Sequence, residues 1–167
     1  LGIFVSDGQG NCVYTNAAYH KISGLSFEQT LGSNWSTAIH PDDRQRVLAE
    51  WRAAAMGQET FQTEYRFLQE QGTVVWTRVS SAPMEDGLNP HGRIKTVEDI
   101  SERKEAASRL LHLAYHDPLT HLPNRLAFDS QLELIIRASE RDSKQMALML
   151  IDLDRFKTVN DTLGHHV

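Results

Sequence analysis

Two carboxylates near the end of the chain are the side chains best suited to chemistry. Asp152 and Asp154 follow directly on residues 146–151, a continuously apolar run that predicts a strand buried on both faces. Mg²⁺ prefers carboxylate oxygens, and the end of a rigid strand is a good place to hold them. An Asp-x-Asp pair at a strand end is also common as a solvated surface feature. From these residues alone, both interpretations stay open.

A pair of histidines is the second candidate. His112 and His116 lie four residues apart in a predicted helix, a spacing that places two imidazoles on one helix face. No third ligand is evident from the sequence. A solvated helix face is therefore favoured over a metal site.

Charge and cysteine content exclude several classes of protein. The 167 residues include 17 Lys+Arg and 22 Asp+Glu, a net charge of −5, whereas nucleic-acid-binding domains usually carry a basic stripe. A single cysteine excludes an intramolecular disulfide framework and a Cys-rich zinc module. The apolar run at residues 146–151 is far short of the roughly 18–20 residues that span a bilayer. No signal peptide opens the chain, so a membrane anchor is expected only if a segment precedes Leu1.

The first hundred residues predict an α+β module. A turn at residues 7–10 separates two β-rich runs, which predicts a hairpin. His40 and Pro41 mark the start of a long helix that ends at Gly57. Three further strands follow the helix, the first with aromatic and polar residues in alternation. The predicted strands cover residues 2–6, 12–14, 61–67, 75–80 and 94–97.

Residues 101–116 predict a helix rich in charged residues, Ala and Leu. Ala106, Leu110 and Leu113 recur at intervals of four and three, as on a coiled-coil seam. The stretch covers only about two heptads, fewer than a firm coiled-coil prediction needs. We favour a dimeric coiled coil, with a linker helix packed on one of its own domains as the alternative.

A second region begins beyond Pro118, which ends this helix. The sequence predicts a helix from Asn124 to about Arg141, the strand at residues 146–151, and a short helix from Phe156. A strand buried on both faces needs neighbouring strands, and the remaining residues do not supply them. We expect this second domain to be incomplete within the sequence.

Residues 1–104 resemble a PAS domain, a fold of five antiparallel strands with flanking helices. The order and spacing of several features carry the resemblance: Gly2-Ile3-Phe4, Asn16-Ala17-Ala18-Tyr19, His40-Pro41-Asp42-Asp43, the aromatic strand 61–67, Trp76, and Asp99-Ile100-Ser101-Glu102-Arg103-Lys104. PAS domains are sensors that hold haem, flavin, small acids or no ligand. The PAS ligand of this chain stays unknown.

Four side chains bear on that ligand. Cys12 is interpreted as a small core residue, because the photoreactive flavin subclass carries its cysteine on a short helix. His40 is interpreted as a helix cap in preference to a haem ligand. Trp35 and Trp51 suit the wall of a flavin pocket, but large aromatic side chains at such spacing are more often plain core.

Residues 115–167 resemble the first part of a GGDEF, or diguanylate cyclase, domain, a palm-like α/β fold. The matching segments are residues 117–125 (DPLTHLPNR), 151–157 (IDLDRFK) and 159–165 (VNDTLGH). His121 stands where the family usually has glycine in a tight turn, which costs energy if the backbone there needs a positive φ. His166 follows the usual Gly-His pair, and the Gly-Gly-Asp/Glu-Glu-Phe signature is absent from the sequence.

The resemblance implies a metal site. Asp152 and the backbone carbonyl of Leu153 correspond to ligands of Mg²⁺ or Mn²⁺, and Asp154 lies beside them. It assigns no catalytic residue within this sequence.

The resemblance also implies residues that bind substrate and residues that hold structure. Asn160 would recognise the guanine edge, with a helix-end cap as its alternative role. Phe156 and Lys157 would wrap the triphosphate, with Lys157 otherwise a solvated surface residue. Three residues would hold the first turn and the helix cap: Asp117, Asn124 and Arg125.

Together the resemblances predict a PAS sensor domain at residues 1–100, a helical signalling linker at 101–116 and the N-terminal part of a GGDEF domain at 117–167. They imply a bacterial-type signalling protein in which the sensor controls the condensation of two GTP molecules to cyclic di-GMP. Because the signature loop is absent, this chain by itself is expected to be inactive.

Two alternative functions stay open. In the first alternative, the GGDEF part is degenerate and acts as a GTP-binding regulator of a downstream phosphodiesterase. In the second, the chain is purely a PAS dimerisation or sensor module. The expected partners are a second copy of the chain, through the PAS domain and the linker helix, and GTP; nucleic acid is not expected. The expected location is cytoplasmic.

Overall fold

The computed structural model describes residues 1–57, 60–84 and 92–163. The chain divides into two compact units, Leu1–Leu111 and His112–Val167. In the described part, no helix is both long enough and apolar enough to cross a membrane.

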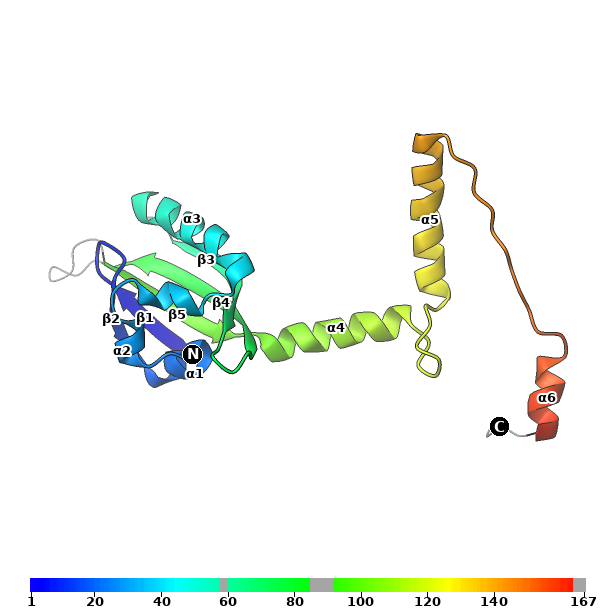
Figure 1. Ribbon diagram of the computed structural model, residues 1–167, viewed down its shortest axis with the longest axis horizontal. Helices are drawn as coiled ribbons and strands as arrows, with labels where there is room; N and C mark the ends of the chain where they lie inside the picture. The colour runs from blue at the N-terminus through cyan, green and yellow to red at the C-terminus, as the bar shows by residue number, and fades with distance from the viewer. Residues whose placement is uncertain (58–59, 85–91, 164–167) are drawn as a thin grey trace. The chain divides into compact units, whose positions relative to one another are not determined.

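A five-stranded antiparallel sheet forms the first unit (Figure 1). Its strand order is β2-β1-β5-β4-β3, so the last strand in sequence lies between the first strand and β4. In that central position Val97 is paired with Gly2 on one side and with Val79 on the other. The five strands predicted from the alternation of residues are all present: β1 (Gly2–Ser6), β2 (Cys12–Thr15), β3 (Phe61–Leu68), β4 (Val74–Pro83) and β5 (Arg93–Asp99).

Four described helices of the first unit lie between β2 and β3 in sequence. Asn16 caps the first of them by accepting a hydrogen bond from the N–H of Tyr19, and Ser26 with Gln29 forms a capping box on the second. The elements are α1 (Ala17–Ser23), α2 (Phe27–Thr30), the 3₁₀ helix η1 (Asn34–Ala38) and α3 (Pro41–Gly57).

His40 acts as the cap of α3, as expected. Its carbonyl accepts hydrogen bonds from the N–H groups of Asp43 and Arg44, and its Nδ1 lies 3.4 Å from the N–H of Asp42. The same helix start is tied to the sheet by an ion pair. Asp43 Oδ2 accepts from Arg66 Nε at 2.8 Å and from the Arg66 backbone N–H at 3.0 Å. These hydrogen bonds lower the pKa of Asp43 to about 2.

One hydrophobic core lies between the sheet and these helices. Alternate strand residues such as Phe4 and Phe67 point into it and are 1% and 0% exposed. Tyr19 of α1 packs against both rings, at centroid distances of 5.5 and 6.0 Å. Cys12 is buried in the same core, in agreement with its interpretation as a small core residue.

The remaining helices are α4 (Ser101–Tyr115), α5 (Arg125–Asp142) and α6 (Phe156–Leu163). All three agree with the sequence analysis to within two residues. None of the residues of α4 is buried. Leu110, on the expected seam, is 68% exposed.

The strand predicted at residues 146–151 is not formed. This segment has no regular secondary structure, and Leu150 is 92% exposed. A strand needs a neighbour to take up its backbone N–H and C=O groups. Among the described residues, the only sheet is the one in the first unit, and this segment has no strand beside it. The strand that the apolar content predicted was therefore wrong for this segment, because no neighbouring strand in the described part takes up its backbone N–H and C=O groups.

Candidate functional site

A tight turn at residues 117–122 precedes α5. Asp117 Oδ1 accepts from the N–H groups of Leu119 and Thr120, at 3.1 and 2.8 Å, and from Thr120 Oγ1 at 2.8 Å. These hydrogen bonds, led by that of the Thr120 N–H, hold the pKa of Asp117 below its usual value. The N–H of His121 donates to the carbonyl of Asp117 at 2.9 Å. His121 has φ 59°, so the non-glycine residue stands in the left-handed conformation that the sequence analysis anticipated.

Asn124 connects the end of α4 to the start of α5. Its Oδ1 accepts from the N–H of Ala127, which caps α5, while its Nδ2 donates to the carbonyl of Ala114 at 2.8 Å. Its own N–H donates to the carbonyl of Tyr115 at 2.9 Å. Arg125 is placed differently: its side chain is 94% exposed, with Nε 3.9 Å from Asp129 Oδ2. Asp117 therefore holds the turn and Asn124 caps the helix that follows it, whereas the Arg125 side chain takes part in neither.

The predicted metal ligands lie on the exposed segment before α6. Asp152 Oδ1 accepts from the N–H of Leu153 at 2.8 Å, and both residues and Asp154 are exposed. In the described part of the chain, no three His, Cys, Asp or Glu side chains are grouped to hold a metal ion. The donors themselves suit a hard cation, because a carboxylate and a backbone carbonyl both offer oxygen.

The predicted substrate-binding residues belong to α6. Lys157 is exposed in its first turn. The side chains of Phe156 and Asn160 lie outside the described residues, although their backbones belong to the helix.

A buried lysine in the first unit was missed by the sequence analysis. Lys95 of β5 is 5% exposed, and its Nζ lies 4.3 Å from the ring centroid of Trp35, 4.6 Å from that of Phe4 and 5.3 Å from that of Trp51. Burial lowers the pKa of Lys95 to about 7, helped by the nearby positive charge of Arg93. Its burial follows from the register of the sheet, in which Lys95 lies opposite Phe4, on the same face of the sheet as Val97.

The two tryptophans are core residues here. The rings of Trp35 and Trp51 meet edge to face at 6.1 Å, and both rings face Lys95. Trp51 Nε1 and Ser6 Oγ are buried, and neither has a hydrogen-bond partner among the described residues.

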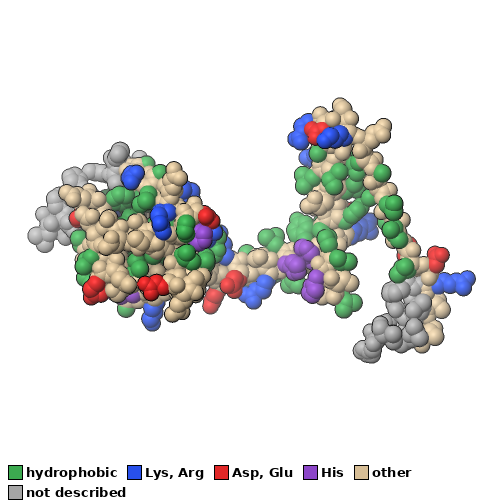
Figure 2. All heavy atoms as spheres, viewed as in Figure 1, with side chains coloured by type: hydrophobic (Ala, Val, Ile, Leu, Met, Phe, Trp, Pro, Cys, Tyr) green, Lys and Arg blue, Asp and Glu red, His purple; other side chains and the backbone are tan. Residues whose placement is uncertain are grey.

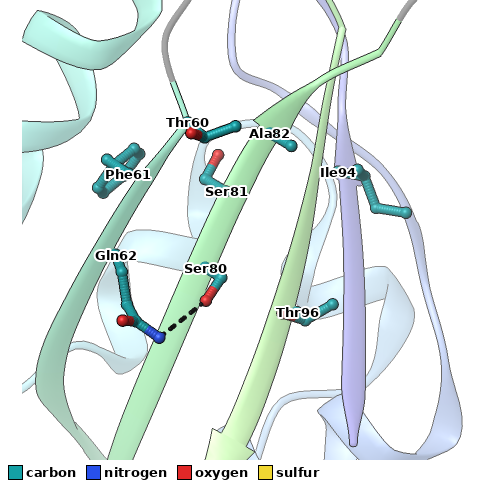
Figure 3. Close-up of a pocket in the computed structure, with 8 residues that line it drawn as sticks. All are labelled: Thr60, Phe61, Gln62, Ser80, Ser81, Ala82, Ile94 and Thr96. Carbon is teal, nitrogen blue, oxygen red and sulfur yellow. Dashed lines mark hydrogen bonds between the residues drawn. The ribbon is translucent and has the colours of Figure 1, made fainter.

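A pocket of about 420 Å³ lies where β3, β4 and β5 run side by side (Figure 3). Its lining includes Phe61, Ser80, Ile94 and Thr96, and Gln62 Nε2 donates to Ser80 Oγ at 3.2 Å. None of the described residues that line it has a titratable side chain, so these residues supply no general acid or base.

The start of α4 is bound to the sheet by a network around Glu64 of β3. Its carboxylate lies 2.7 Å from Lys104 Nζ and 3.1 Å from an Arg103 nitrogen, both on α4, and 3.3 Å from Arg78 of β4. The hydrogen bond from Lys104 is the main cause of the lowered pKa of Glu64.

Backbone hydrogen bonds reinforce this junction. Ser101 Oγ accepts from the N–H of Trp76 at 3.0 Å, and the N–H of Ile100 donates to the carbonyl of Trp76 at 2.8 Å. The helix that leaves the first unit is therefore attached to two strands of its sheet.

Two family models match the chain. The model described as "PAS fold" matches residues 12–98, and the model described as "Diguanylate cyclase, GGDEF domain" matches residues 114–167.

Curated relatives extend these matches. The chain is 30% identical over 156 residues to the "Probable diguanylate cyclase DgcE" of Escherichia coli strain K12, covering 91% of this chain and 14% of that protein. It is 48% identical over 62 residues to the "Bifunctional diguanylate cyclase/cyclic di-GMP phosphodiesterase MucR" of Pseudomonas aeruginosa, covering 37% of this chain and 9% of that protein. The chain thus spans only a small part of the length of either relative.

Solved structures resemble the first unit. The N-terminal domain of a diguanylate cyclase with PAS/PAC sensor from Marinobacter aquaeolei aligns with a TM-score of 0.55 and 20% identity, covering 62% of this chain and 97% of that chain. A PAS domain from Colwellia psychrerythraea aligns with a TM-score of 0.53 and 25% identity, covering 61% and 87%.

Proposed function

Because the chain belongs to the PAS-fold family and continues from residue 114 as a GGDEF domain, we propose that it is part of a PAS-regulated diguanylate cyclase. Its reaction would join two GTP molecules to cyclic di-GMP, and we include in the proposal a cytoplasmic location, since GTP is the substrate. The observation that carries the proposal is the order of the two family matches on one chain. We also propose that the chain is divided into a PAS sensor (residues 1–100), a helical linker (101–116) and the first part of the cyclase domain (117–167).

Diguanylate cyclases require a divalent metal ion. We propose that the Asp152 carboxylate and the Leu153 carbonyl would hold it, as Mg²⁺ or Mn²⁺, with Asp154 beside them. Such an ion neutralises negative charge on the reacting phosphates and makes the attacking hydroxyl more acidic. The exposed Asp152 carboxylate supports this role, because among the described residues its only hydrogen bond is the one that Oδ1 accepts from the N–H of Leu153.

The substrate would be bound by α6. We propose Asn160 for the guanine edge, and Phe156 and Lys157 for the triphosphate. Lys157 supports this role because it is exposed in the first turn of the helix, where free backbone N–H groups and the helix dipole favour an anion.

The linker would carry the signal from the sensor. The Glu64 network attaches the first turn of α4 to β3 and β4, so a change in the sheet reaches the helix directly. We propose that the protein acts as a homodimer through the PAS domain and α4, because the Ala106–Leu110–Leu113 seam is exposed on the described helix.

The test is cyclic di-GMP production by the full-length protein that contains this chain. Asp152→Ala is expected to lower turnover by at least about 100-fold, since the metal carboxylate is lost. Asp129→Ala is the matched control, because it removes an exposed carboxylate from α5 and is expected to leave turnover unchanged. Circular dichroism would verify that both variants fold.

A folded full-length protein that binds GTP and forms no product would overturn the cyclase proposal and would indicate a GTP-binding regulator. Unchanged turnover in Asp152→Ala would leave the cyclase activity standing and would overturn only the role of Asp152 as metal ligand.

A further inference from the structure

We propose that His112, His116 and His121 form a binding site for a divalent transition-metal ion at the end of α4. All three belong to the unit His112–Val167. Figure 2 shows a group of histidine side chains at this end of the helix. The site is separate from Asp152 and does not depend on the proposed cyclase activity.

The first observation is the geometry of the helix pair. The rings of His112 and His116, four residues apart on α4, are stacked with centroids 4.1 Å apart and planes 18° apart. Two histidines at this spacing on one helix face are a recurrent pair of metal ligands. His112 is exposed and His116 is half-buried, so an ion from solvent can reach them.

The second observation is the position of His121. The turn at residues 117–122 brings its ring to 6.2 Å from that of His112, which supplies the third imidazole that the sequence did not reveal. His121 is held there with φ 59°, a conformation that costs energy for any residue except glycine. A strained backbone that presents a ligand-type side chain beside two others is the kind of outlier that points to function.

The third observation concerns the orientation of the His116 ring. Its Nδ1 lies 3.1 Å from the carbonyl oxygen of His112, which can only accept, so Nδ1–H donates to that oxygen and Nε2 is the ring nitrogen left for a metal ion. Metal-binding histidines commonly make this kind of hydrogen bond to a backbone carbonyl, which fixes the tautomer and the ring.

The donor set determines the class of ion. Three neutral imidazoles suit Zn²⁺, Ni²⁺, Co²⁺ or Cu²⁺, whereas Mg²⁺ prefers oxygen ligands. The three rings do not yet converge in the described residues, where no group of three such side chains is arranged to hold an ion. Binding therefore requires the exposed ring of His121 to rotate toward the helix pair.

The consequence of binding is a link between two elements. An ion on all three histidines would join the last turn of α4 to the turn that precedes α5. Asn124 already connects these segments through the carbonyls of Ala114 and Tyr115. The ion would make this junction stiffer, in the segment that follows the sensor and precedes the cyclase domain.

The test is direct metal binding to the tag-free full chain, with Co²⁺ absorption and Zn²⁺ or Ni²⁺ titration calorimetry. His121→Gly is the decisive variant, because glycine adopts φ 59° without strain and the fold is not put at risk. We expect affinity to fall at least roughly tenfold in His121→Gly and further in His112→Ala or His116→Ala. His20→Gln, which replaces a histidine that contacts Thr15 in the first unit, is the matched control and should leave affinity unchanged.

Several results would overturn the site. They are absence of binding, an unchanged affinity in His121→Gly, or an equal loss in His20→Gln. An affinity that falls in Asp152→Ala would equally assign the bound ion to another site. Because the readout is binding and not turnover, failure here leaves the cyclase proposal untouched, and the reverse also holds.

Discussion

Similar apolar side chains are buried in the first unit of the chain and exposed in the second. In the first unit, Phe67 is 0% exposed and Val97 is 1% exposed, enclosed between the sheet and the helices. In the second, Met149 is 80% exposed and Leu150 is 92% exposed. Apolar composition alone therefore does not produce a core: a core also requires a second layer against which the side chains can pack.

The same comparison explains which secondary structure forms without packing. The helix α5 satisfies its backbone internally and is capped by Asn124, although none of its residues is buried. The segment at residues 146–151 cannot satisfy its backbone in this way, and it is irregular. Local signals are enough for a helix, while a strand depends on a partner.

Loss of a core ring gives the sharpest test of this difference. Phe67→Ala is expected to lower the free energy of unfolding of the first unit by about 3–5 kcal/mol, because it leaves a cavity under the sheet. Phe128→Ala in α5, where the ring is 43% exposed, should cost less than about 1 kcal/mol. Urea unfolding followed by tryptophan fluorescence measures the first unit, since the three tryptophans are residues 35, 51 and 76, and far-UV circular dichroism in the same titration also follows the helices of the second unit. A similar loss of unfolding free energy in both variants would contradict the expected difference between the two units.

Lys95 is the charged exception inside the well-packed unit. Replacing it by methionine is expected to raise the free energy of unfolding at pH 7 by about 2–4 kcal/mol, because an ammonium group without a carboxylate partner among the described residues is removed from the core. Arg52→Met, on the exposed part of α3, is the control and should have little effect. A destabilised Lys95→Met protein would show that the surrounding rings of Phe4, Trp35 and Trp51 stabilise the ammonium group by more than its burial costs.

The pH dependence of stability gives an independent check on Lys95. Its pKa is about 7 in the folded chain, against an ordinary value of 10.5. Between these values the unfolded state binds more protons, so the wild-type protein should become more stable as pH rises from about 7 to about 9. Above that range the raised pKa values of Cys12 and Tyr19 act in the opposite direction. Lys95→Met should lose the rise, and a retained rise would contradict the assignment.

Besides its apolar core, the first unit contains the ion pair between Asp43 of α3 and Arg66 of β3. Asp43→Asn is expected to cost about 2 kcal/mol, since the Arg66 guanidinium loses the closer and more buried of its two carboxylate partners, Asp43 and Asp42. The pKa of Asp43 is about 2 in the folded chain, below its usual 3.8, so this stabilisation is present above pH 4 and is lost as pH falls toward 2. Asp42→Asn is the matched control, because that side chain is 70% exposed. Equal effects of the two variants in acid titrations of stability would contradict this role.

The smallest effect is expected in the turn of the second unit. His121→Gly should stabilise the turn by about 0.5 kcal/mol, because glycine relieves the positive φ but gains more freedom when unfolded. Exchange of the Asp117 amide, which donates to the carbonyl of Leu122, should slow about twofold. His121→Ala keeps the strain and should not slow exchange. Slower exchange in both variants would indicate that the imidazole, and not the backbone, destabilises the turn.

Most of the first unit could be predicted from its sequence. The alternation from Phe61 to Phe67 predicted β3, and the residues around His40 predicted the start of α3, because both signals are local. Burial of Lys95 could not be predicted, since hydropathy places a lysine on the surface and only the register of β5 against β1 points it inward. The pairing of β5 with β1 connects distant residues, which no local pattern records.

The candidate sites divide in the same way. The turn that contains Asp117 and Asn124 could be anticipated, because its hydrogen bonds join residues close in sequence. The approach of His121 to His112 could not, since it depends on how the chain folds back after α4. The roles of Asp152 and Asn160 remain predictions, as they rest on resemblance and not on any arrangement among the described residues.

The central position of β5 also has consequences for how the first unit folds. Residues 2–6 pair with residues 93–97, so the sheet closes only after a loop of about 85 residues has been brought together. The hairpin of β3 and β4 is local and can form early, whereas β1 must wait for the last strand to leave the ribosome. A chain interrupted before residue 93 would expose the unpaired edges of β1 and β4. Such a product should aggregate during synthesis, when the complete unit does not.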